Sequence, residues 1–285
     1  MDNLITGDED NISAWRTHPG FTFLRHDVVQ PLEHQAEAIF HLASPTGPLG
    51  LGRPLEPSLA NSLGTYNLLD LARRAGARLL LASTSEAYGD PLEHPQREDY
   101  WGHCNPVGPR ACYDEAKRYA ESLTMVYVRQ FGLDGRIARI FNCYGPHNRP
   151  DDGRVVPNFV TQALTGLPLT IYGTGKQTRS LCYVDDMVDG LMRLMFAERT
   201  QGEVVNIGNP EERTVLEFAE TIKALCASPS PIVFLPATED DPQRRRPDIA
   251  KARALLDWEP RVGLTEGLEK TIAWFHRKLA AEGKL

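Results

Sequence analysis

The sequence lacks several features that would mark a membrane, secreted or nucleic-acid-binding protein. It contains no run of 18 apolar residues, the length a transmembrane helix requires. It shows no charged-then-apolar N-terminal signal. The formal net charge is −7, which argues against nucleic acid as a general partner. We therefore expect a protein that neither spans a membrane nor binds nucleic acid.

Cysteine is also scarce, and its pattern is uninformative for metal or disulfide chemistry. The five cysteines are odd in number, form no CxxC pair and lie in apolar or helical-looking segments. This usage is typical of reduced thiols in a cytoplasmic protein, so we expect no disulfide and no metal site. The residues are Cys104, Cys112, Cys143, Cys182 and Cys226.

The remaining composition is that of a globular chain. It has 285 residues, of which 41% are hydrophobic and 24% charged. Such a chain can bury one large core or two joined cores.

Short apolar runs alternate with helical patterns in the first half of the chain. Strands are predicted over 21–28, 38–44, 78–84 and 136–142. Helices are predicted over 58–76 and 113–132, each ending on a glycine. This alternation predicts an α/β fold, in which helices cover both faces of a doubly wound, Rossmann-like parallel sheet.

The composition of the sequence changes after residue 142. Proline and glycine become frequent, and short strands (LTIYG, EVVNIGN) and a helix (TVLEFAETIKALCA) follow. We expect a first domain over 1–142 and a smaller α/β lobe over 143–285. Part of the second stretch, about residues 180–206, is expected to return to the first domain.

Hydroxyl groups and a carboxyl group follow the predicted strand 78–84. In a parallel sheet the carboxyl ends of strands meet where ligands bind, so Thr84, Ser85 and Glu86 are expected to face a crevice. Tyr113 and Lys117 follow at i, i+4 spacing, which places them on one helix face. An ammonium there would lower the tyrosine pKa from about 10 toward neutrality. This spacing alone is weak evidence for a catalytic pair, because it is common on surface helices. The hydroxyl-bearing strand end before it and the RIFNCYGP turn after it strengthen the interpretation.

Seven segments together resemble an extended short-chain dehydrogenase/reductase that acts on nucleotide sugars. The nearest family is UDP-glucuronate decarboxylase, also called UDP-xylose synthase, and the resemblance runs from residue 2 to about 275. Dehydratases of the superfamily carry Thr-Asp-Glu where this chain has Thr84-Ser85-Glu86, and epimerases usually lack the glutamate. The segments are HLAS, STSEAYGDP, YDEAK, ARIFNCYGP, DDGRVVPNF, YGTGKQTRS and YVDDMVDG.

The resemblance implies a reaction and roles for five residues. NAD takes hydride from C4 of the glucuronate while Tyr113, supported by Lys117, accepts the hydroxyl proton and Thr84 holds the oxygen. The resulting β-keto acid loses CO2, and return of the hydride yields UDP-xylose. Glu86 would orient the ring or manage a proton, and Arg179 would hold the sugar carboxylate or the diphosphate.

The resemblance also implies cofactor and substrate contacts. Asp2 matches the acid that binds the adenosine ribose, which favours NAD over its phosphorylated form. Of the run 244–246, read as a mostly solvated surface, only Arg246 receives a role, and His41 is interpreted as a packed core histidine. Further NAD contacts are expected from Asn3, Ile5, Thr6, Gly7, Asp27, Val28, Leu42, Ser44, Ala82, Tyr113, Lys117 and Arg154. UDP-sugar contacts are expected from Asn142, Tyr172, Gln177, Arg179 and Arg246.

One segment of the family pattern has no counterpart in this sequence. Family members begin with a strand, a GxxGxxG phosphate loop and a helix, about 30 residues that would precede Asp2. The hypotheses are a misassigned or truncated start, which we favour because the downstream catalytic positions are present, or a degenerate homologue. The chain as written is expected to bind NAD poorly and to be marginally stable.

Three functional interpretations follow. The first is the decarboxylase, which the resemblance implies to be a homodimer joined through the helices at 58–76 and 113–132. The second is another NAD-dependent nucleotide-sugar enzyme, a 4,6-dehydratase or a 4-epimerase. The third is a non-catalytic remnant that binds a sugar nucleotide or a sister subunit.

Overall fold

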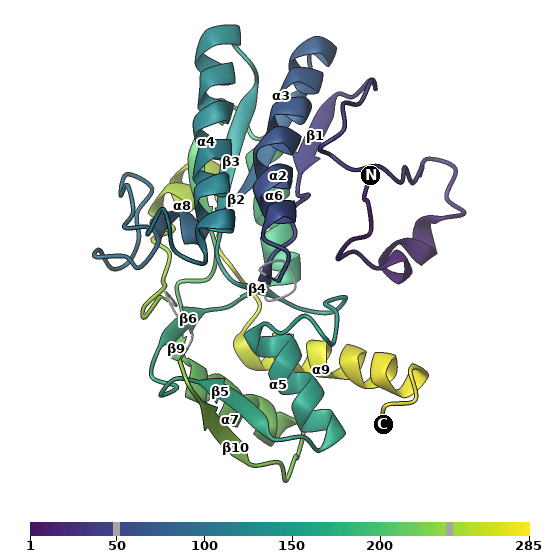
Figure 1. The fold of residues 1–285 in the computed structure, drawn as a ribbon, viewed down its shortest axis with the longest axis vertical. Helices are drawn as coiled ribbons and strands as arrows, with labels where there is room; N and C mark the ends of the chain where they lie inside the picture. The colour runs from purple at the N-terminus through teal and green to yellow at the C-terminus, as the bar shows by residue number, and fades with distance from the viewer. Residues whose placement is uncertain (48–51, 238–241) are drawn as a thin grey trace.

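A four-stranded parallel sheet forms the first lobe of the computed structural model, which describes residues 1–47, 52–237 and 242–285 (Figure 1). The strands are adjacent in the order β1 (Ala38–His41), β2 (Arg78–Thr84), β3 (Gly135–Ile140) and β8 (Val204–Ile207). All three pairings are parallel, with Leu81 opposite His41 on one side and Ile137 on the other. Parallel pairing brings all four carboxyl ends to one edge of the sheet.

Helices cover both faces of this sheet because its strand residues alternate between two cores. Leu79 and Leu81 of β2 pack into the core shared with α3 (Leu63–Ala75) and α4 (Ala111–Phe131). Leu80 points the other way, into the core shared with α6 (Val184–Phe196) and α8 (Ala250–Leu256). The predicted doubly wound α/β fold is confirmed.

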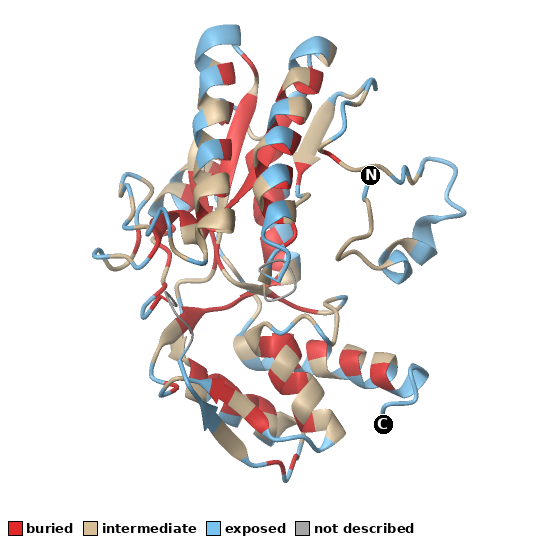
Figure 2. Ribbon diagram, in the orientation of Figure 1, coloured by how far each residue is buried: buried red, intermediate tan, exposed pale blue. Residues whose placement is uncertain are grey.

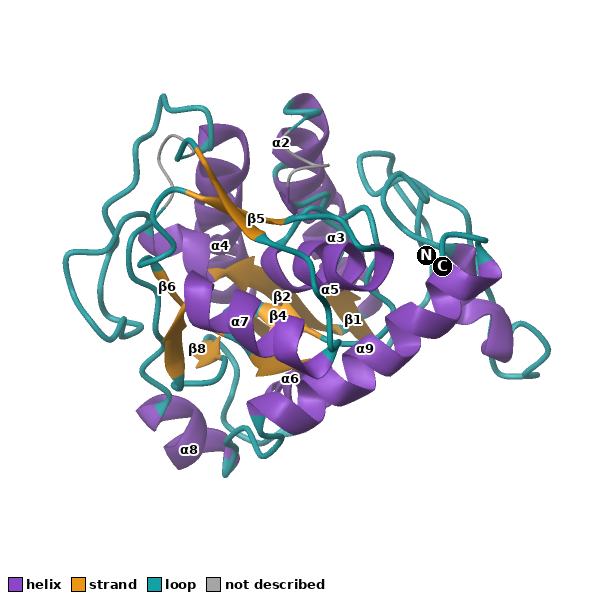
Figure 3. Ribbon diagram, turned by 90° about the horizontal axis from the view of Figure 1, so that it is seen from below, coloured by secondary structure: helices purple, strands orange, loops and turns teal. Residues whose placement is uncertain are grey.

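The second lobe lies beneath the carboxyl edge of the sheet and has its own core. Figure 3, seen from below, shows its helices α5 (Val155–Thr165), α7 (Val215–Leu225) and α9 (Leu264–Ala281) in front of the sheet. Phe159, Phe218 and Phe275, one from each helix, are buried together. Its strands pair as β5 (Leu169–Tyr172) with β10 (Ile232–Leu235), β4 (Cys143–Tyr144) with β7 (Cys182–Tyr183), and β6 (Thr178–Ser180) with β9 (Glu212–Thr214).

Most predicted elements are found close to their predicted bounds. The strand at 78–84 is β2, and the helix at 113–132 is α4, which ends at Gly132 in the left-handed conformation. The single helix predicted over 58–76 is wrong in one respect. It is two helices, α2 (Leu55–Asn61) and α3, which meet at Ser62, whose backbone angles (φ −100°, ψ −75°) depart from helical values.

The predicted strand over 21–28 is wrong. Within the described residues, its one β contact is an isolated bridge between Arg25 and Asp2. A strand needs a continuous partner for its backbone groups, and Asp2 provides a partner of a single residue. The segment before β1, which includes the 3-10 helix η1 (Glu9–Trp15), is largely exposed in Figure 2.

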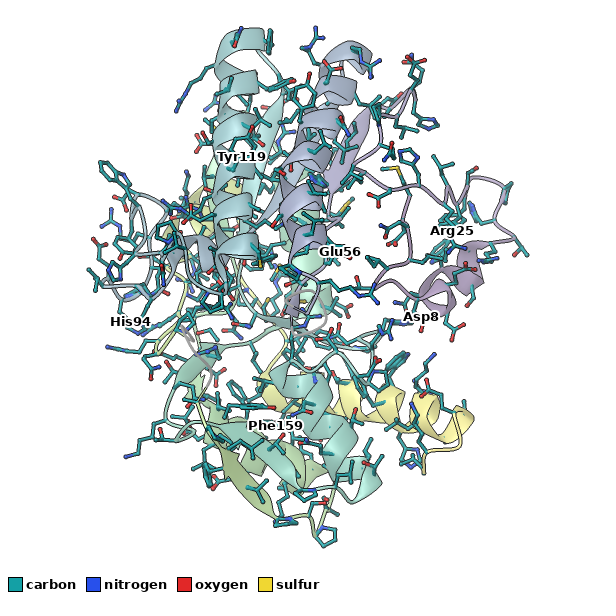
Figure 4. The ribbon with its side chains drawn as sticks, in the orientation of Figure 1. Asp8, Arg25, Glu56, His94, Tyr119 and Phe159 are labelled. Atoms are coloured by element: carbon teal, nitrogen blue, oxygen red, sulfur yellow. The ribbon has the colours of Figure 1, made fainter. Side chains whose placement is uncertain are left out.

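Side-chain hydrogen bonds and ion pairs attach this N-terminal segment to the rest of the protein, among them the following. Asn67 of α3 donates a 2.9 Å hydrogen bond to the carbonyl of Val28. Lys278 of α9 reaches Asp8 (3.3 Å) and Asp10 (2.7 Å), and Figure 4 shows Asp8 and Arg25 at opposite ends of the segment's loop.

In the part of the chain that the structure describes, none of the helices combines the length and the apolar character that a membrane span requires.

Gly89 closes the turn that follows β2 and is expected to be intolerant of a side chain. It has φ +64°, and a Cβ there would overlap the backbone carbonyl of His103. Gly76, with φ +66°, has no atom within 4 Å of the corresponding position and provides the matched control. Gly76→Ala should lower the free energy of unfolding by about 1–2 kcal/mol. Gly89→Ala should cost about 1–3 kcal/mol more, because the backbone must shift.

Urea unfolding of the two variants measures this difference. Equal losses would contradict the close approach of His103 to Gly89.

Candidate active site

The carboxyl ends of β1, β2 and β3 bring the predicted catalytic residues to the junction of the two lobes. Thr84 ends β2, Ser44 follows β1, and Asn142 follows β3. The Oγ atom of Ser44 accepts a 2.9 Å hydrogen bond from Asn61 of α2. Asn142 Oδ1 is buried and has no hydrogen-bond partner among the described residues, which suits a site that a polar ligand completes.

Tyr113 and Lys117 lie on the first turns of α4, directly over the end of β2. The Tyr113 hydroxyl hydrogen-bonds the side chains of Thr46 and Thr84. Lys117 is buried, its Nζ atom lies 5.9 Å from the centre of the Tyr113 ring, and it donates a 2.6 Å hydrogen bond to the carbonyl of Ala82. The i, i+4 spacing therefore places both side chains at the strand end, as predicted.

The predicted fall in the tyrosine pKa is wrong for the protein without ligands. Burial raises the pKa of Tyr113 above its usual value, although its hydrogen bonds to Thr46 and Thr84 oppose this rise. Burial also lowers the pKa of Lys117 to about 7, so near neutral pH the ammonium is only partly charged. The sequence spacing could not reveal how far folding removes water from each of the two groups.

Glu86 is held by two arginines that the sequence analysis did not assign. Arg245 binds it with two hydrogen bonds, of 2.8 Å to Oε1 and 2.7 Å to Oε2, and Arg110 binds Oε2 at 2.8 Å. Burial alone would raise the pKa of Glu86, but these arginines lower it to about 2. Glu86 is therefore ionised at neutral pH.

The interpretation of residues 244–246 as a mostly solvated run is wrong for Arg245, which is only 4% exposed. In an extended chain successive side chains point to opposite sides, so the middle of three arginines must face away from its neighbours. Arg244 is exposed and Arg246 partly buried. The alternation expected of an extended chain could therefore have predicted that Arg245 is buried. Pro247 beside the run favours such an extended conformation.

The residues expected to bind the adenosine end lie together in the N-terminal segment. Asn3 donates a 2.9 Å hydrogen bond to Asp27, and Asp2 accepts one from the backbone of Leu4 (2.6 Å). A Cβ at Gly7 would lie 3.0 Å from the Asp2 carboxylate, so a side chain there would require that carboxylate to shift. Val28 is buried, whereas Leu42, after β1, is 55% exposed. The partly buried residues Ile5 and Thr6 complete the loop.

Arg154, the last expected cofactor contact, lies at the N-terminus of α5. It forms an ion pair with Asp152 (2.5 Å), and the electrostatic influence of Tyr113 reaches it. The structure therefore brings Arg154 toward the tyrosine site from the second lobe.

The expected UDP contacts come from the second lobe. Gln177 donates a 2.7 Å hydrogen bond to the carbonyl of Tyr172, which ends β5 and is 48% exposed. Arg179 of β6 is buried and donates to the carbonyls of Thr178 and Pro242 at 2.8 and 2.9 Å. The backbone N–H of Arg246 donates a 2.8 Å hydrogen bond to Gln96.

His41 is a packed core residue, as predicted. It is 1% exposed, its Nε2 atom lies 3.0 Å from the hydroxyl of Thr65, and burial lowers its pKa to about 3. All five cysteines are free thiols.

A parallel α/β sheet with a tyrosine–lysine pair over its carboxyl edge defines a nucleotide-binding oxidoreductase-like class of protein. The model of the NAD dependent epimerase/dehydratase family matches residues 18–208, and the chain belongs to this family. Within it, the chain groups with proteins named UDP-glucuronic acid decarboxylase.

Two such relatives illustrate the match. UDP-glucuronic acid decarboxylase 1 of Danio rerio is 55% identical over 280 residues, which cover 98% of this chain and 66% of the relative. UDP-glucuronic acid decarboxylase 6 of Arabidopsis thaliana is 54% identical over 268 residues, covering 94% and 78%. The chain thus spans just under two thirds of the length of the Danio rerio relative.

Solved structures show the same fold. A UDP-glucose 4-epimerase from Thermotoga maritima superposes with a TM-score of 0.88 at 28% identity, covering 98% of this chain and 90% of the other. UDP-glucuronic acid 4-epimerase from Bacillus cereus, in complex with UDP-glucuronic acid and NAD, gives a TM-score of 0.84 at 28% identity, covering 95% and 86%.

Proposed function

We propose that this protein is an NAD-dependent decarboxylase that converts UDP-glucuronate to UDP-xylose. The observation that carries the proposal is the Glu86–Arg245–Arg110 cluster, which lies beside the Thr84–Tyr113 pair. Two guanidinium groups in this cluster, the buried one of Arg245 and the partly buried one of Arg110, suit a sugar that carries a carboxylate. The identity to proteins named UDP-glucuronic acid decarboxylase supports the same substrate.

The residues present fit NAD as the cofactor. The turn in which Gly7 lies against the Asp2 carboxylate would hold the adenosine end, and the buried Lys117 would face the nicotinamide ribose. When bound, NAD supplies the acceptor for the C4 hydride and later returns that hydride. We propose that residues 1–142 bind this cofactor, while most of 143–285 binds the nucleotide sugar.

The protein's own groups handle protons and the developing oxyanion. Tyr113 would take the proton of the sugar C4 hydroxyl, with Thr84 holding the same oxygen. Once C4 is a ketone, the bond between C5 and the carboxylate breaks, and the electron pair is delocalised onto the C4 oxygen. The hydroxyls of Tyr113 and Thr84 would stabilise this enolate by hydrogen bonds. Arg245 and Arg110 would orient the carboxylate before it leaves.

The roles of the remaining nucleotide contacts are part of the same proposal. Tyr172 and Gln177 would bind the uridine, and Arg179 and Arg246 the diphosphate. Asn142, whose Oδ1 atom has no partner among the described residues, would bind the sugar or diphosphate.

A 4-epimerase is the second candidate, because the solved structures reported above include two 4-epimerases with this fold. Ser85 and Glu86 favour the decarboxylase. The mass of the product distinguishes the two, since epimerisation leaves the mass unchanged.

We also propose a homodimer that joins through α2, α3 and α4. These helices expose large apolar side chains at helical spacing, and Figure 4 shows Tyr119 on the outer surface of α4. An exposed apolar stripe on adjacent helices is typical of a subunit interface. A monomer mass in solution would contradict it. The exposed residues are Leu55, Leu59, Leu63, Tyr66, Tyr119 and Val126.

The five free thiols support a cytoplasmic location.

The proposed activity is tested by incubating the purified chain with UDP-glucuronate and NAD and measuring the sugar-nucleotide masses. Loss of CO2 to give a UDP-pentose is the expected result. An unchanged mass would contradict the proposal if calorimetry shows that NAD and UDP-glucuronate are both bound.

A further inference from the structure

Glu86 is a single carboxylate that hydrogen-bonds two arginines. Both Glu86 oxygens are occupied, Oε1 by Arg245 and Oε2 by Arg245 and Arg110. Two guanidinium groups thus face one carboxylate, which leaves an excess positive charge in a buried place. A second negative charge is needed nearby to balance it.

Asp114 is the remaining acid of this cluster, and it is the least constrained. It is 8% exposed, and its Oδ1 atom has no hydrogen-bond partner among the described residues. Its Oδ2 atom lies 3.8 Å from Arg110 Nε, beyond hydrogen-bond distance. A buried carboxylate without hydrogen bonds is costly, so this group accepts a proton easily.

The charged and titratable groups around Asp114 come from several parts of the chain. Glu86 lies near it in the turn after β2, and Arg245 lies near it in the segment before α8. On and beside α4, its other neighbours are Cys104, Arg110, Cys112, Tyr113 and Glu115. Burial and the charge of Glu86 raise the pKa of Asp114 to about 7, against the opposing effect of Arg110 and Arg245.

We propose that Asp114 is a proton store, which takes up a proton when the sugar carboxylate binds beside Arg110 and Arg245 and releases it as that carboxylate is lost. The inference rests on the proposed decarboxylase function. Asp114 acts through Arg110 and Glu86 and is therefore a positioning residue, without contact to the sugar.

The chemistry of decarboxylation agrees with this role. The bond between C5 and the carboxylate carbon breaks, CO2 leaves without charge, and its bonding electrons stay on the sugar as an enolate. C5 then takes one proton, so each turnover removes one negative charge and consumes one proton. If Asp114 releases its proton at that point, its own negative charge replaces that of the lost carboxylate. The charge facing the two arginines then stays constant through the cycle.

Proton uptake on binding is the decisive measurement. Calorimetric titration with UDP-glucuronate at pH 8, in two buffers of different ionisation heat, gives the number of protons taken up; NAD is left out, so that C4 is not oxidised and turnover consumes no proton. The wild type should take up about one proton, because Asp114 is mostly ionised at this pH before binding. UDP-glucose, which has no carboxylate, should cause no uptake. Asp114→Asn should lose the uptake, and the control Glu115→Gln, a partly exposed neighbour on α4, should keep it.

A second measurement tests whether Asp114 binds a proton near neutral pH in the absence of any nucleotide. Difference potentiometric titration should show that Asp114→Asn binds about one proton fewer than the wild type across the range pH 5–9. Asp114→Glu restores a carboxyl group and should restore that proton. If Asp114→Asn does not fold, carboxyl carbon NMR of the wild type should show an aspartate that titrates near pH 7.

The outcomes separate this inference from the proposed function. Formation of UDP-pentose with unchanged proton uptake in Asp114→Asn would overturn the inference alone. Absence of any carboxyl titrating near pH 7 would overturn it whether or not a nucleotide sugar binds. Proton uptake with UDP-glucuronate but no UDP-pentose would instead overturn the proposed reaction, while the coupling of binding to Asp114 would stand.

Discussion

Tyr113→Phe is expected to lower the rate of UDP-glucuronate turnover by about 10²–10⁴-fold, the range in which a positioned acid–base group contributes. The substitution removes only the hydroxyl, which hydrogen-bonds Thr46 and Thr84. The proton of the sugar C4 hydroxyl would then have no acceptor at the end of β2, although the aromatic ring still fills its place. The measurement is the initial rate of UDP-pentose formation with saturating NAD.

Tyr119→Phe is the matched control, because Tyr119 lies on the same helix and is 53% exposed. Its turnover should remain within about twofold of wild type. A Tyr113→Phe protein that keeps a tenth or more of the wild-type rate would show that another group accepts the proton.

Arg245→Met is expected to cause the largest loss of stability, about 3–5 kcal/mol in the free energy of unfolding. The change removes both hydrogen bonds that Arg245 makes to Glu86 and leaves a buried carboxylate with Arg110 as its remaining cation. Methionine conserves much of the side-chain volume, so the loss reports on charge more than on packing. Urea unfolding at pH 7 measures it, and Arg244→Met, an exposed neighbour, should change stability by less than about 0.5 kcal/mol.

The double variant Glu86→Gln, Arg245→Met should recover part of the loss, because the buried negative charge is gone. A double variant as unstable as the sum of the two single variants would contradict direct coupling of this pair.

The pH dependence of stability provides an independent view of the same pair. Glu86 has a pKa of about 2 in the folded protein, below its ordinary value of 4.5. A lowered pKa means that the folded protein binds this proton less tightly than the unfolded chain. The stabilisation is therefore present above about pH 4.5 and is lost as the pH falls toward 2. In Arg245→Met the pKa of Glu86 should rise, and acid unfolding should begin at a higher pH.

The sequence by itself determined the elements whose local pattern agrees with their tertiary surroundings. The continuous apolar run of β2 predicted a buried central strand, and Gly132 predicted the end of α4. The spacing of Tyr113 and Lys117 predicted one shared helix face, because that relation depends only on helix geometry. The resemblance to the decarboxylases added the family, which the comparisons confirm.

Only the tertiary structure decided the features that depend on distant partners. The apolar pattern at 21–28 is compatible with a strand, but in the part of the chain that the structure describes its backbone has only Asp2 as a β partner. Arg245 lies 159 residues from Glu86 in sequence, so no local pattern could pair them. The pKa values of Tyr113 and Lys117 depend on how much water the folded chain removes from both groups, and burial outweighed the expected effect of their spacing. Local geometry follows from sequence spacing, whereas solvation and long-range charge pairing exist only once the chain has folded.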